Sequence, residues 1–284
     1  MAIIVDGKKI ATTILEDLKT RVETIRKKGV VPALAVVRVG DNKPSITYIK
    51  KKEESAQKIG VDFFKFEYTD DTDKETLITR IKEIQAEHRL SGMILQLPVP
   101  EHLWPFTREI VNNININIDV DCLSHLALGR LMMKESPLVP PTPGAIMEIL
   151  KYHQVDLKGK ELCLVGRGDL IGKPLAAMLA YEPVTLVTCG KSTTDLSHYT
   201  KTADIIVTGV GKKNLISGNM VKEGAIVIDA GVSFEGERMF GDIEFESVKK
   251  KAFLVTPTPG GVGPITVVKL LENTVKVAES GIIH

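Results

Sequence analysis

The sequence predicts an α/β protein that folds as two α/β domains around a cleft, the second of them a doubly wound parallel sheet. The chain has 284 residues, and a single compact core seldom extends over so many. Apolar runs of strand length alternate with stretches of helical period, the βαβα order that is typical of parallel sheets covered by helices. This order begins again after Pro140–Pro143, which indicates a second domain.

The first domain is placed at residues 1–138. Its expected elements, in chain order, are the strand Ala33–Val39, a helix from Ser45, the strand Phe63–Tyr68, the helix Thr76–His88 and the strand Gly92–Leu95. The segment Asn112–Leu123 alternates Ile with Asn or Asp, as either a half-buried strand or an irregular crossing segment would. We favour the crossing segment.

The second domain is placed at residues 139–263. Its expected elements are the helix Gly144–Tyr152, the strand Glu161–Val165, the helix Gly172–Ala180 and the strands Thr185–Thr188, Ile205–Thr208 and Ala225–Asp229. Beyond it, Pro264–Ala278 is amphipathic and begins with a proline, which fits the first turn of a helix. A final helix is therefore expected over residues 264–284.

Composition excludes several classes of protein. Lys and Arg number 37 and Asp and Glu 36, so a net charge of +1 gives no broad field for a nucleic acid. The apolar runs are far shorter than the roughly 20 residues that span a bilayer, so no membrane partner is expected. The N-terminal residues do not resemble a signal peptide, and three scattered cysteines predict neither disulfides nor a zinc site. The cytoplasm is the expected location, without a metal.

A glycine-rich turn predicts a nucleotide site in the second domain. Residues 165–172 read VGRGDLIG, which places Gly166, Gly168 and Gly172 between a strand and a helix. Such glycines let backbone amides approach a pyrophosphate at a helix N-terminus, as in Rossmann-like domains. The alternative is a tight turn that binds no ligand.

The residues after the next strand favour NADP over NAD. An NAD site usually carries Asp or Glu about 20 residues beyond the glycines, to bind the ribose 2′-hydroxyl. Here Cys189, Gly190, Lys191 and Ser192 occupy that place, and together with Arg167 they can bind a 2′-phosphate. Alternatively the two cations are solvated surface charges, and NAD remains possible.

Lys52 is the candidate for proton transfer in the first domain. Tyr48 and Lys52 are four residues apart and share a helix face with Ala56 and Ile59, so the amine is partly desolvated and its pKa lowered. The alternative is that the ammonium reaches back to water. Gln96 follows a strand at its carboxyl end, where open α/β sheets place ligand groups, although it can also cap the loop.

Two further segments carry candidate ligand groups. Asp119 and Asp121 are two apart and face opposite ways if extended, which suits neither an acid/base pair nor a metal site, but one can bind a ligand. His125 is an alternative base, although a lone histidine is more often structural. Residues 256–266, TPTPGGVGPIT, form either a clamp over a planar ligand or a rigid turn.

Taken together, the motifs resemble the methylenetetrahydrofolate dehydrogenase/cyclohydrolase family. They are VGDNKPSITYIKKKEESAQKIG, LQLP, DVDC, PPTPGA, VGRGDLIGKP, GDIEF and TPTPGGVGPIT, in the order of that family and over essentially the whole chain. The resemblance implies NADP-dependent oxidation of 5,10-methylenetetrahydrofolate to the methenyl form, and hydrolysis of that form to 10-formyltetrahydrofolate. It also implies a role in one-carbon metabolism and purine biosynthesis, a homodimer, and a last helix that returns to the first domain.

The same resemblance implies the role of each site residue. Lys52 would be the catalytic lysine, with Gln96 hydrogen-bonded to it and Tyr48 packed on the pterin. Asp121 would bind the amino edge of the pterin. Gly261 and Pro264, in the last motif, would contact the substrate.

Some residues depart from the family pattern. Cys122 and Ala145 replace glycines, Gly168 replaces a serine, GKST replaces a His-Ser-Lys stretch, and residues 209–213 have lysine in place of proline. Two other functions are the alternatives. A dehydrogenase of a carbocyclic hydroxy acid would not explain LQLP together with GGVGP, and a non-catalytic nucleotide-binding protein would not need Lys52.

Overall fold

The computed structural model describes residues 2–236 and 238–281 and divides them into two compact units. Residues 2–11 and 142–266 form the six-stranded unit, and residues 12–141 and 267–281 form the three-stranded unit. Both are α/β units built on parallel sheets, so the predicted fold class is confirmed. Residues 282–284, the end of the expected last helix, lie outside the described residues.

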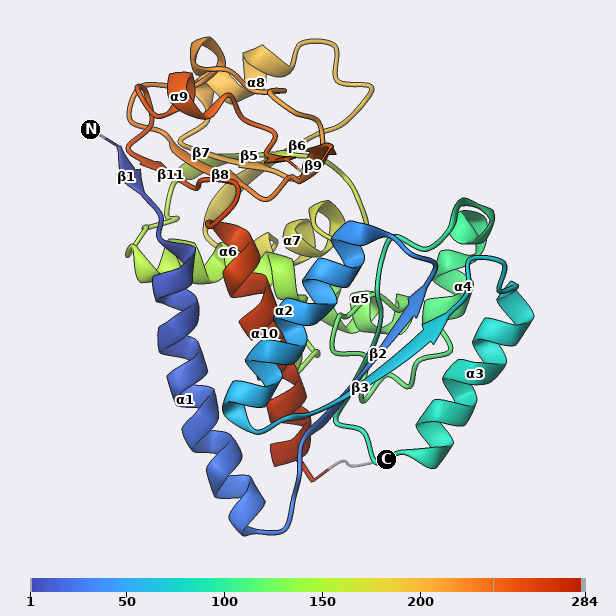
Figure 1. Ribbon diagram of the computed structural model, residues 1–284. Helices are drawn as coiled ribbons and strands as arrows, with labels where there is room; N and C mark the ends of the chain where they lie inside the picture. Colours follow the sequence, from blue (N-terminus) through green and yellow to red (C-terminus); the bar gives the residue numbers. More distant parts are fainter. Residues whose placement is uncertain (1, 237, 282–284) are drawn as a thin grey trace. The chain divides into compact units, whose positions relative to one another are not determined.

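The larger sheet has the strand order β1-β11-β8-β7-β5-β6, and all of its neighbouring strands are parallel. Figure 1 shows it with α8 and α9 on one face and α6 and α7 on the other. The strands are β1 (Ile3–Ile4), β5 (Lys160–Val165), β6 (Val184–Cys189), β7 (Ile205–Thr208), β8 (Ile226–Asp229) and β11 (Leu254–Val255). The helices are α6 (Pro141–Tyr152), α7 (Gly172–Leu179), α8 (Leu196–Thr202), η2 (Gly218–Met220) and α9 (Phe245–Val248), with a hairpin of β9 (Ser233–Glu235) and β10 (Arg238–Phe240).

The N-terminal residues differ from the expected domain division. Residues 1–138 are all expected in the first domain, but β1 pairs with β11 in the six-stranded unit, with Ile3 opposite Leu254. The physical reason is that β11 would otherwise be a sheet edge with unpaired backbone groups, and β1 supplies the partner. A two-residue strand has too short a pattern for period analysis to detect.

The smaller sheet has the order β3-β2-β4. All seven residues of the central strand β2 are buried, because helices cover a parallel sheet on both faces. Figure 1 shows α2 and α3 on either side of β2 and β3. The elements are α1 (Gly7–Lys27), β2 (Ala33–Val39), α2 (Lys43–Ile59), β3 (Asp62–Tyr68), α3 (Lys74–Glu87), β4 (Gly92–Leu95), η1 (Glu101–Phe106), α4 (Thr107–Val111) and α5 (His125–Met132).

The segment Asn112–Leu123 contains no named strand among the described elements, and its only pairing to a strand is an isolated bridge between Met93 and Asp119. The irregular interpretation was therefore the better of the two. The last helix, α10 (Val262–Glu279), begins in the six-stranded unit and contributes residues from 267 onward to the three-stranded unit. There its Asn273 side chain donates hydrogen bonds to the carbonyls of Val120 and Val139, at 2.8 and 2.7 Å.

Candidate active site

Lys52 lies on a helix whose start is fixed by its sequence. The side chain of Asn42 accepts a hydrogen bond from the backbone amide of Ser45 at 3.0 Å, which satisfies one of the free donors of the first turn of α2. Ala56 is buried, and Lys52, one turn before it, is half-buried. The shared helix face predicted from spacing is therefore present, and it brings the amine of Lys52 to the edge of the core.

Gln96 meets Lys52 from the end of β4. The Nζ of Lys52 donates a hydrogen bond to Oε1 of Gln96 at 2.8 Å, and Nε2 of Gln96 donates to the carbonyl of Leu97 at 2.7 Å. Because the second bond fixes the amide nitrogen, the amide oxygen must face the lysine. Strand β4 and helix α2 thus hold one polar pair at the carboxyl edge of the small sheet, where the sequence predicted ligand groups.

Asp121 completes a cluster of charge around this pair. Burial lowers the pKa of Lys52, and the attraction of the Asp121 carboxylate partly opposes that effect. Burial raises the pKa of Asp121 to about 6, although the Lys52 ammonium favours the ionised form. The pKa of each group therefore lies nearer to neutral pH than it does in water, which favours proton exchange with a ligand. Tyr48, one turn before Lys52, is half-buried, and burial raises the pKa of its hydroxyl.

Asp119 has a different task from Asp121. It is 1% exposed, and its carboxylate accepts hydrogen bonds from the backbone amides of Ser124 at 2.9 Å and Leu123 at 3.3 Å. It therefore shapes the loop that leads into α5. His125 is exposed at the start of α5, and its ring contacts the Asn112 side chain at 3.1 Å. Nothing in its described contacts joins it to Lys52, so it is a weaker candidate for the base.

Cys122, the departure from the glycine of the family, occupies a backbone conformation that favours glycine. Its φ is 55°, in the left-handed region where a side chain costs roughly 1–2 kcal/mol. Its side chain is 2% exposed, so the residue packs in the core in spite of that conformation. Because Cys122 follows Asp121 directly, it restricts the backbone that carries the carboxylate.

In the six-stranded unit, the turn between β5 and α7 is closely packed at two of its three glycines. A β-carbon at Gly172 would lie 2.2 Å from the carbonyl oxygen of Gly166, and Gly166 itself has a φ of 118°. Gly168 differs, because no atom would lie within 4 Å of a β-carbon there. The turn therefore needs glycine at positions 166 and 172 for its shape, whereas position 168 has room for a side chain.

Arg167 and the loop after β6 lie together. Nη2 of Arg167 donates to the carbonyl of Thr188 at 2.6 Å, and a β-carbon at Gly190 would lie 3.3 Å from Cδ of Arg167. The next residues, Lys191 and Ser192, are exposed. The structure thus gathers at the carboxyl end of β6 the cations that the sequence singled out, and it places no carboxylate at residues 189–193.

Two buried carboxylates order the neighbouring loops, and the sequence analysis assigned no role to either. Asp242 accepts hydrogen bonds from the backbone amides of Val210 and Lys212, both at 2.7 Å. Asp229 accepts from the amides of Gly231 at 2.9 Å and Ile243 at 3.1 Å, and burial raises its pKa to about 7. The signal in the sequence that points to Asp242 is the GDIEF motif, which contains it.

Gly261 and Pro264 lie where α10 begins. A β-carbon at Gly261 would lie 2.7 Å from the carbonyl oxygen of Pro257, and one at Gly7 would lie 1.8 Å from the carbonyl oxygen of Gly261. The backbone at Gly261 therefore lies close to the backbone at Gly7, where α1 begins. Pro264 is half-buried in the first turn of α10, as predicted.

Two other features, a metal-ligand cluster and a membrane-spanning helix, are absent from the part of the chain that the structure describes. Among residues 2–236 and 238–281, no three side chains of His, Cys, Asp or Glu are grouped so that they could hold a metal ion. Within the same residues, no helix combines the length and the apolar character needed to cross a membrane.

Comparison with known proteins gives a consistent result over the whole chain. Residues 5–121 match the model of the tetrahydrofolate dehydrogenase/cyclohydrolase catalytic domain, and residues 140–281 match that of the NAD(P)-binding domain. The bifunctional protein FolD of Nautilia profundicola is 42% identical over 278 residues, which cover 98% of this chain and 97% of that protein.

Solved structures agree with the sequence comparison. The Campylobacter jejuni FolD methylenetetrahydrofolate dehydrogenase/cyclohydrolase is 36% identical, with a TM-score of 0.94 and coverage of 99% of this chain and 100% of that one. The Trypanosoma brucei enzyme, solved in complex with NADP cofactor and inhibitor, is 32% identical, with a TM-score of 0.93 and coverage of 99% and 98%.

Proposed function

The chain belongs to the tetrahydrofolate dehydrogenase/cyclohydrolase family, and on that premise we propose that it catalyses both reactions named by the family. It oxidises 5,10-methylenetetrahydrofolate to the methenyl form and hydrolyses that form to 10-formyltetrahydrofolate, in one-carbon metabolism. The observation that carries this proposal is the Lys52–Gln96–Asp121 group, in which a desolvated amine donates to an amide oxygen and is attracted by a carboxylate. Because both units match this family, we favour it over a dehydrogenase of a carbocyclic hydroxy acid and over a non-catalytic nucleotide-binding protein.

Lys52 moves the proton in the hydrolytic step. The methenyl form is a cation that water attacks: the water oxygen bonds to the one-carbon unit and becomes the formyl carbonyl, and the bond from that carbon to one ring nitrogen breaks. One of the two water protons is released to solvent, and the other must reach that ring nitrogen. An amine whose pKa burial has lowered can accept and return that proton near neutral pH. Gln96 orients the amine, because its oxygen accepts one of the Nζ protons at 2.8 Å. Tyr48, one helical turn away, supplies a flat half-buried surface for the pterin.

Asp121 binds the substrate. An ionised carboxylate can accept two hydrogen bonds from the amino edge of a pterin. Keeping that carboxylate charged among buried groups is unfavourable, as its raised pKa shows, and the Lys52 ammonium reduces the penalty. The pair therefore serves binding as well as proton transfer.

The residues of the six-stranded unit fit a dinucleotide. Gly166 and Gly172 give a turn at the N-terminus of α7 in which side chains have no room, as a pyrophosphate-binding turn requires. When bound, the nicotinamide cofactor supplies the ring that accepts hydride. Arg167, Lys191 and Ser192 would hold a 2′-phosphate, which supports NADP as the preferred cofactor. The NADP complex of the trypanosomal relative also supports this choice.

Four further parts of the proposal rest on the family resemblance alone. The chain acts as a homodimer, it works in the cytoplasm, and its product serves purine biosynthesis. Gly261 and Pro264 contact the substrate. Sedimentation of the purified protein tests the homodimer, because a monomer of 31.1 kDa would contradict it.

The decisive experiment measures both reactions. We expect NADPH absorbance to appear when the protein meets 5,10-methylenetetrahydrofolate and NADP, and methenyltetrahydrofolate absorbance to decay faster than without enzyme. Lys52→Met should slow that decay at least about 100-fold, because it removes a proton-transfer group but keeps an apolar stem of similar length. Its affinity for NADPH should be unchanged. Unimpaired hydrolysis by the variant would contradict the role of Lys52.

A further inference from the structure

The loop of residues 209–213 lies against the glycine turn. Strands β5 and β7 are parallel neighbours, with Val165 opposite Thr208, so the segments that follow them leave the same edge of the sheet. The amide of Gly209 donates to the carbonyl of Val165 at 3.0 Å, and a β-carbon at Gly166 would lie 2.8 Å from the carbonyl oxygen of Gly209. A ligand seated on the turn would therefore have this loop beside it.

A fully buried carboxylate sets the conformation of that loop. Oδ2 of Asp242 accepts hydrogen bonds from Oγ1 of Thr208 and the amide of Val210, and Oδ1 accepts from the amide of Lys212, all at 2.7 Å. Asp242 is 0% exposed, and a β-carbon at Gly231 would lie only 2.1 Å from its carboxyl group. Both carboxylate oxygens of Asp242 thus bind backbone amides of the loop, and these hydrogen bonds fix the backbone of Lys212.

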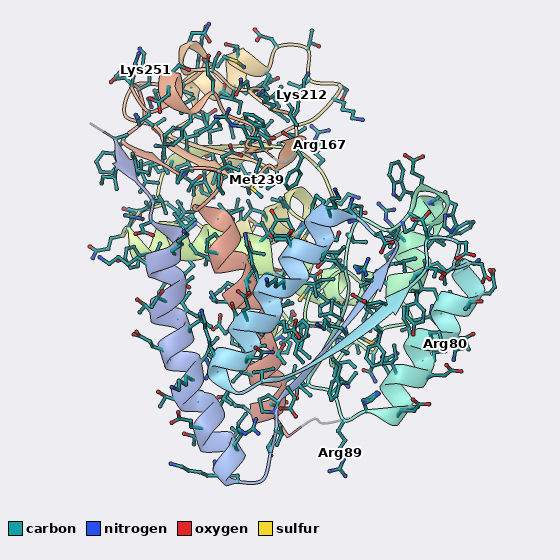
Figure 2. The ribbon with its side chains drawn as sticks, in the orientation of Figure 1. Arg80, Arg89, Arg167, Lys212, Met239 and Lys251 are labelled. Atoms are coloured by element: carbon teal, nitrogen blue, oxygen red, sulfur yellow. The ribbon has the colours of Figure 1, made fainter. Side chains whose placement is uncertain are left out.

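The two lysines of this loop differ in what their ammonium groups contact. Nζ of Lys213 forms an ion pair with Glu235 at 2.5 Å and lies 3.7 Å from the centre of the Phe240 ring. Lys212 is exposed, and within residues 2–236 and 238–281 its ammonium has neither an ion-pair partner nor a hydrogen bond. Figure 2 labels Lys212 and Arg167, which both follow the carboxyl ends of strands in this sheet.

A free ammonium on a loop that lies beside a pyrophosphate turn suits one kind of ligand group. The bridging phosphates of a dinucleotide carry two negative charges, and lysine binds phosphate as a compact point charge. The glycines of the turn have no side chains and can offer these phosphates backbone amides, and Arg167 lies with the loop after β6, where it donates to the carbonyl of Thr188. A cation held next to the turn would therefore attract the pyrophosphate, which NAD and NADP have in common.

We propose that Lys212 binds the pyrophosphate of the dinucleotide, and that Asp242 is the positioning residue that holds Lys212 at the turn. This inference rests on the proposed function, because it deepens the dinucleotide site of the same enzyme. It separates two tasks within that site. Arg167 and Lys191 distinguish NADP from NAD, whereas Lys212 contributes equally to the affinity for both.

The test is a fluorescence titration of the full-length protein with NADPH and with NADH. Lys212→Ala should raise both dissociation constants by the same factor, about threefold to tenfold, where tenfold corresponds to about 1.4 kcal/mol. The difference in dissociation constant between Lys212→Ala and the wild type should shrink in about 0.5 M salt, because an exposed charge pair is screened. Lys213→Ala is the matched control, since it removes an equal charge from the adjacent residue, and its dissociation constants should stay within about twofold of the wild type.

The outcomes separate this inference from the proposed function. A wild type that binds neither dinucleotide overturns both. Unchanged binding by Lys212→Ala, weaker binding of NADPH alone, or an equal loss in Lys213→Ala overturns only the inference. Asp242→Asn should weaken both dinucleotides as Lys212→Ala does, with little added loss in the double variant, because the two changes remove one contact. Fully additive losses would overturn the positioning role, and the Lys212 result stands even if Asp242→Asn does not fold.

Discussion

Replacing Asp121 by asparagine should stabilise the three-stranded unit while it damages the site. The pKa of Asp121 rises from 3.8 to about 6 through burial, and at about 1.36 kcal/mol for each pKa unit the ionised form costs the folded state about 3 kcal/mol at neutral pH. Asparagine has nearly the same shape without the charge. The expected gain in the free energy of unfolding is therefore up to about 3 kcal/mol.

The pH dependence of that gain follows from the direction of the pKa shift. A carboxyl whose pKa is raised on folding stabilises the protein below its unfolded value of 3.8, and this contribution is lost as the pH rises through about 6. The advantage of Asp121→Asn over the wild type should thus be complete above about pH 7 and should disappear near pH 4. An advantage that grows toward acid pH would contradict the argument.

Asp119→Asn is the matched control, two residues away. Burial raises the pKa of Asp119 as well, but hydrogen bonds from neighbouring groups oppose that effect. Its two oxygens accept from the amides of Leu123 and Ser124, so an amide nitrogen in place of one oxygen would face a donor. Leaving such a buried donor unsatisfied costs about 1–3 kcal/mol, which predicts destabilisation at neutral pH. The opposite signs of the two substitutions are the critical result.

Urea unfolding followed by tryptophan fluorescence measures both variants. The chain has one tryptophan, Trp104, in the three-stranded unit, where its indole nitrogen donates to the carbonyl of Val99 at 2.8 Å. The signal therefore reports on the unit that contains both aspartates. If Asp121→Asn is no more stable than the wild type at pH 7.5, or if it binds folate as tightly, the reasoning about this carboxylate is refuted.

Two further predictions concern the dinucleotide site. The wild type should prefer NADP to NAD by at least about tenfold, because one charged hydrogen bond to the 2′-phosphate is worth roughly 1.5–3 kcal/mol before solvent exposure is considered. Arg167→Ala should remove most of that preference and Lys191→Ala less of it, measured as kcat/KM for both cofactors; equal use of NAD and NADP by the wild type would contradict this. Gly172→Ala should abolish dinucleotide binding, since its β-carbon would lie 2.2 Å from the Gly166 carbonyl oxygen, and leave the Trp104 unfolding transition unchanged. Gly168→Ala, with open space around it, is its control, and equal losses in both variants would argue against the steric reason.

The sequence predicted most of the elements that have a clear period, and it missed a strand that depends on a distant partner. Strand β4 was found at Gly92–Leu95, because four apolar residues between turns admit few other interpretations. Strand β1 was missed because its two residues become a strand only by pairing with β11, some 250 positions along the chain. Helix α1, from Gly7 to Lys27, was also not assigned, although its length is sufficient for period analysis.

The candidate site shows the same division. The relation between Tyr48 and Lys52 follows from helical spacing, and the place of Gln96 follows from the end of a strand. The φ of 55° at Cys122 could not be read from the residue type, since cysteine rarely adopts it. The roles of Asp229 and Asp242 depend on loops that only the folded chain brings over them.

The buried and half-buried aspartates also show how a structure separates binding groups from structural ones. Asp119, Asp229 and Asp242 each accept at least two backbone hydrogen bonds, so their carboxyl oxygens hold loops in place. Asp121 has no hydrogen bond within residues 2–236 and 238–281, and among the described groups the cation that favours its charge is Lys52. An ionised carboxylate that lacks backbone donors is unfavourable in the free protein. A ligand that donates to it would remove that penalty, which is why Asp121, and not its neighbour two residues earlier, is suited to bind substrate.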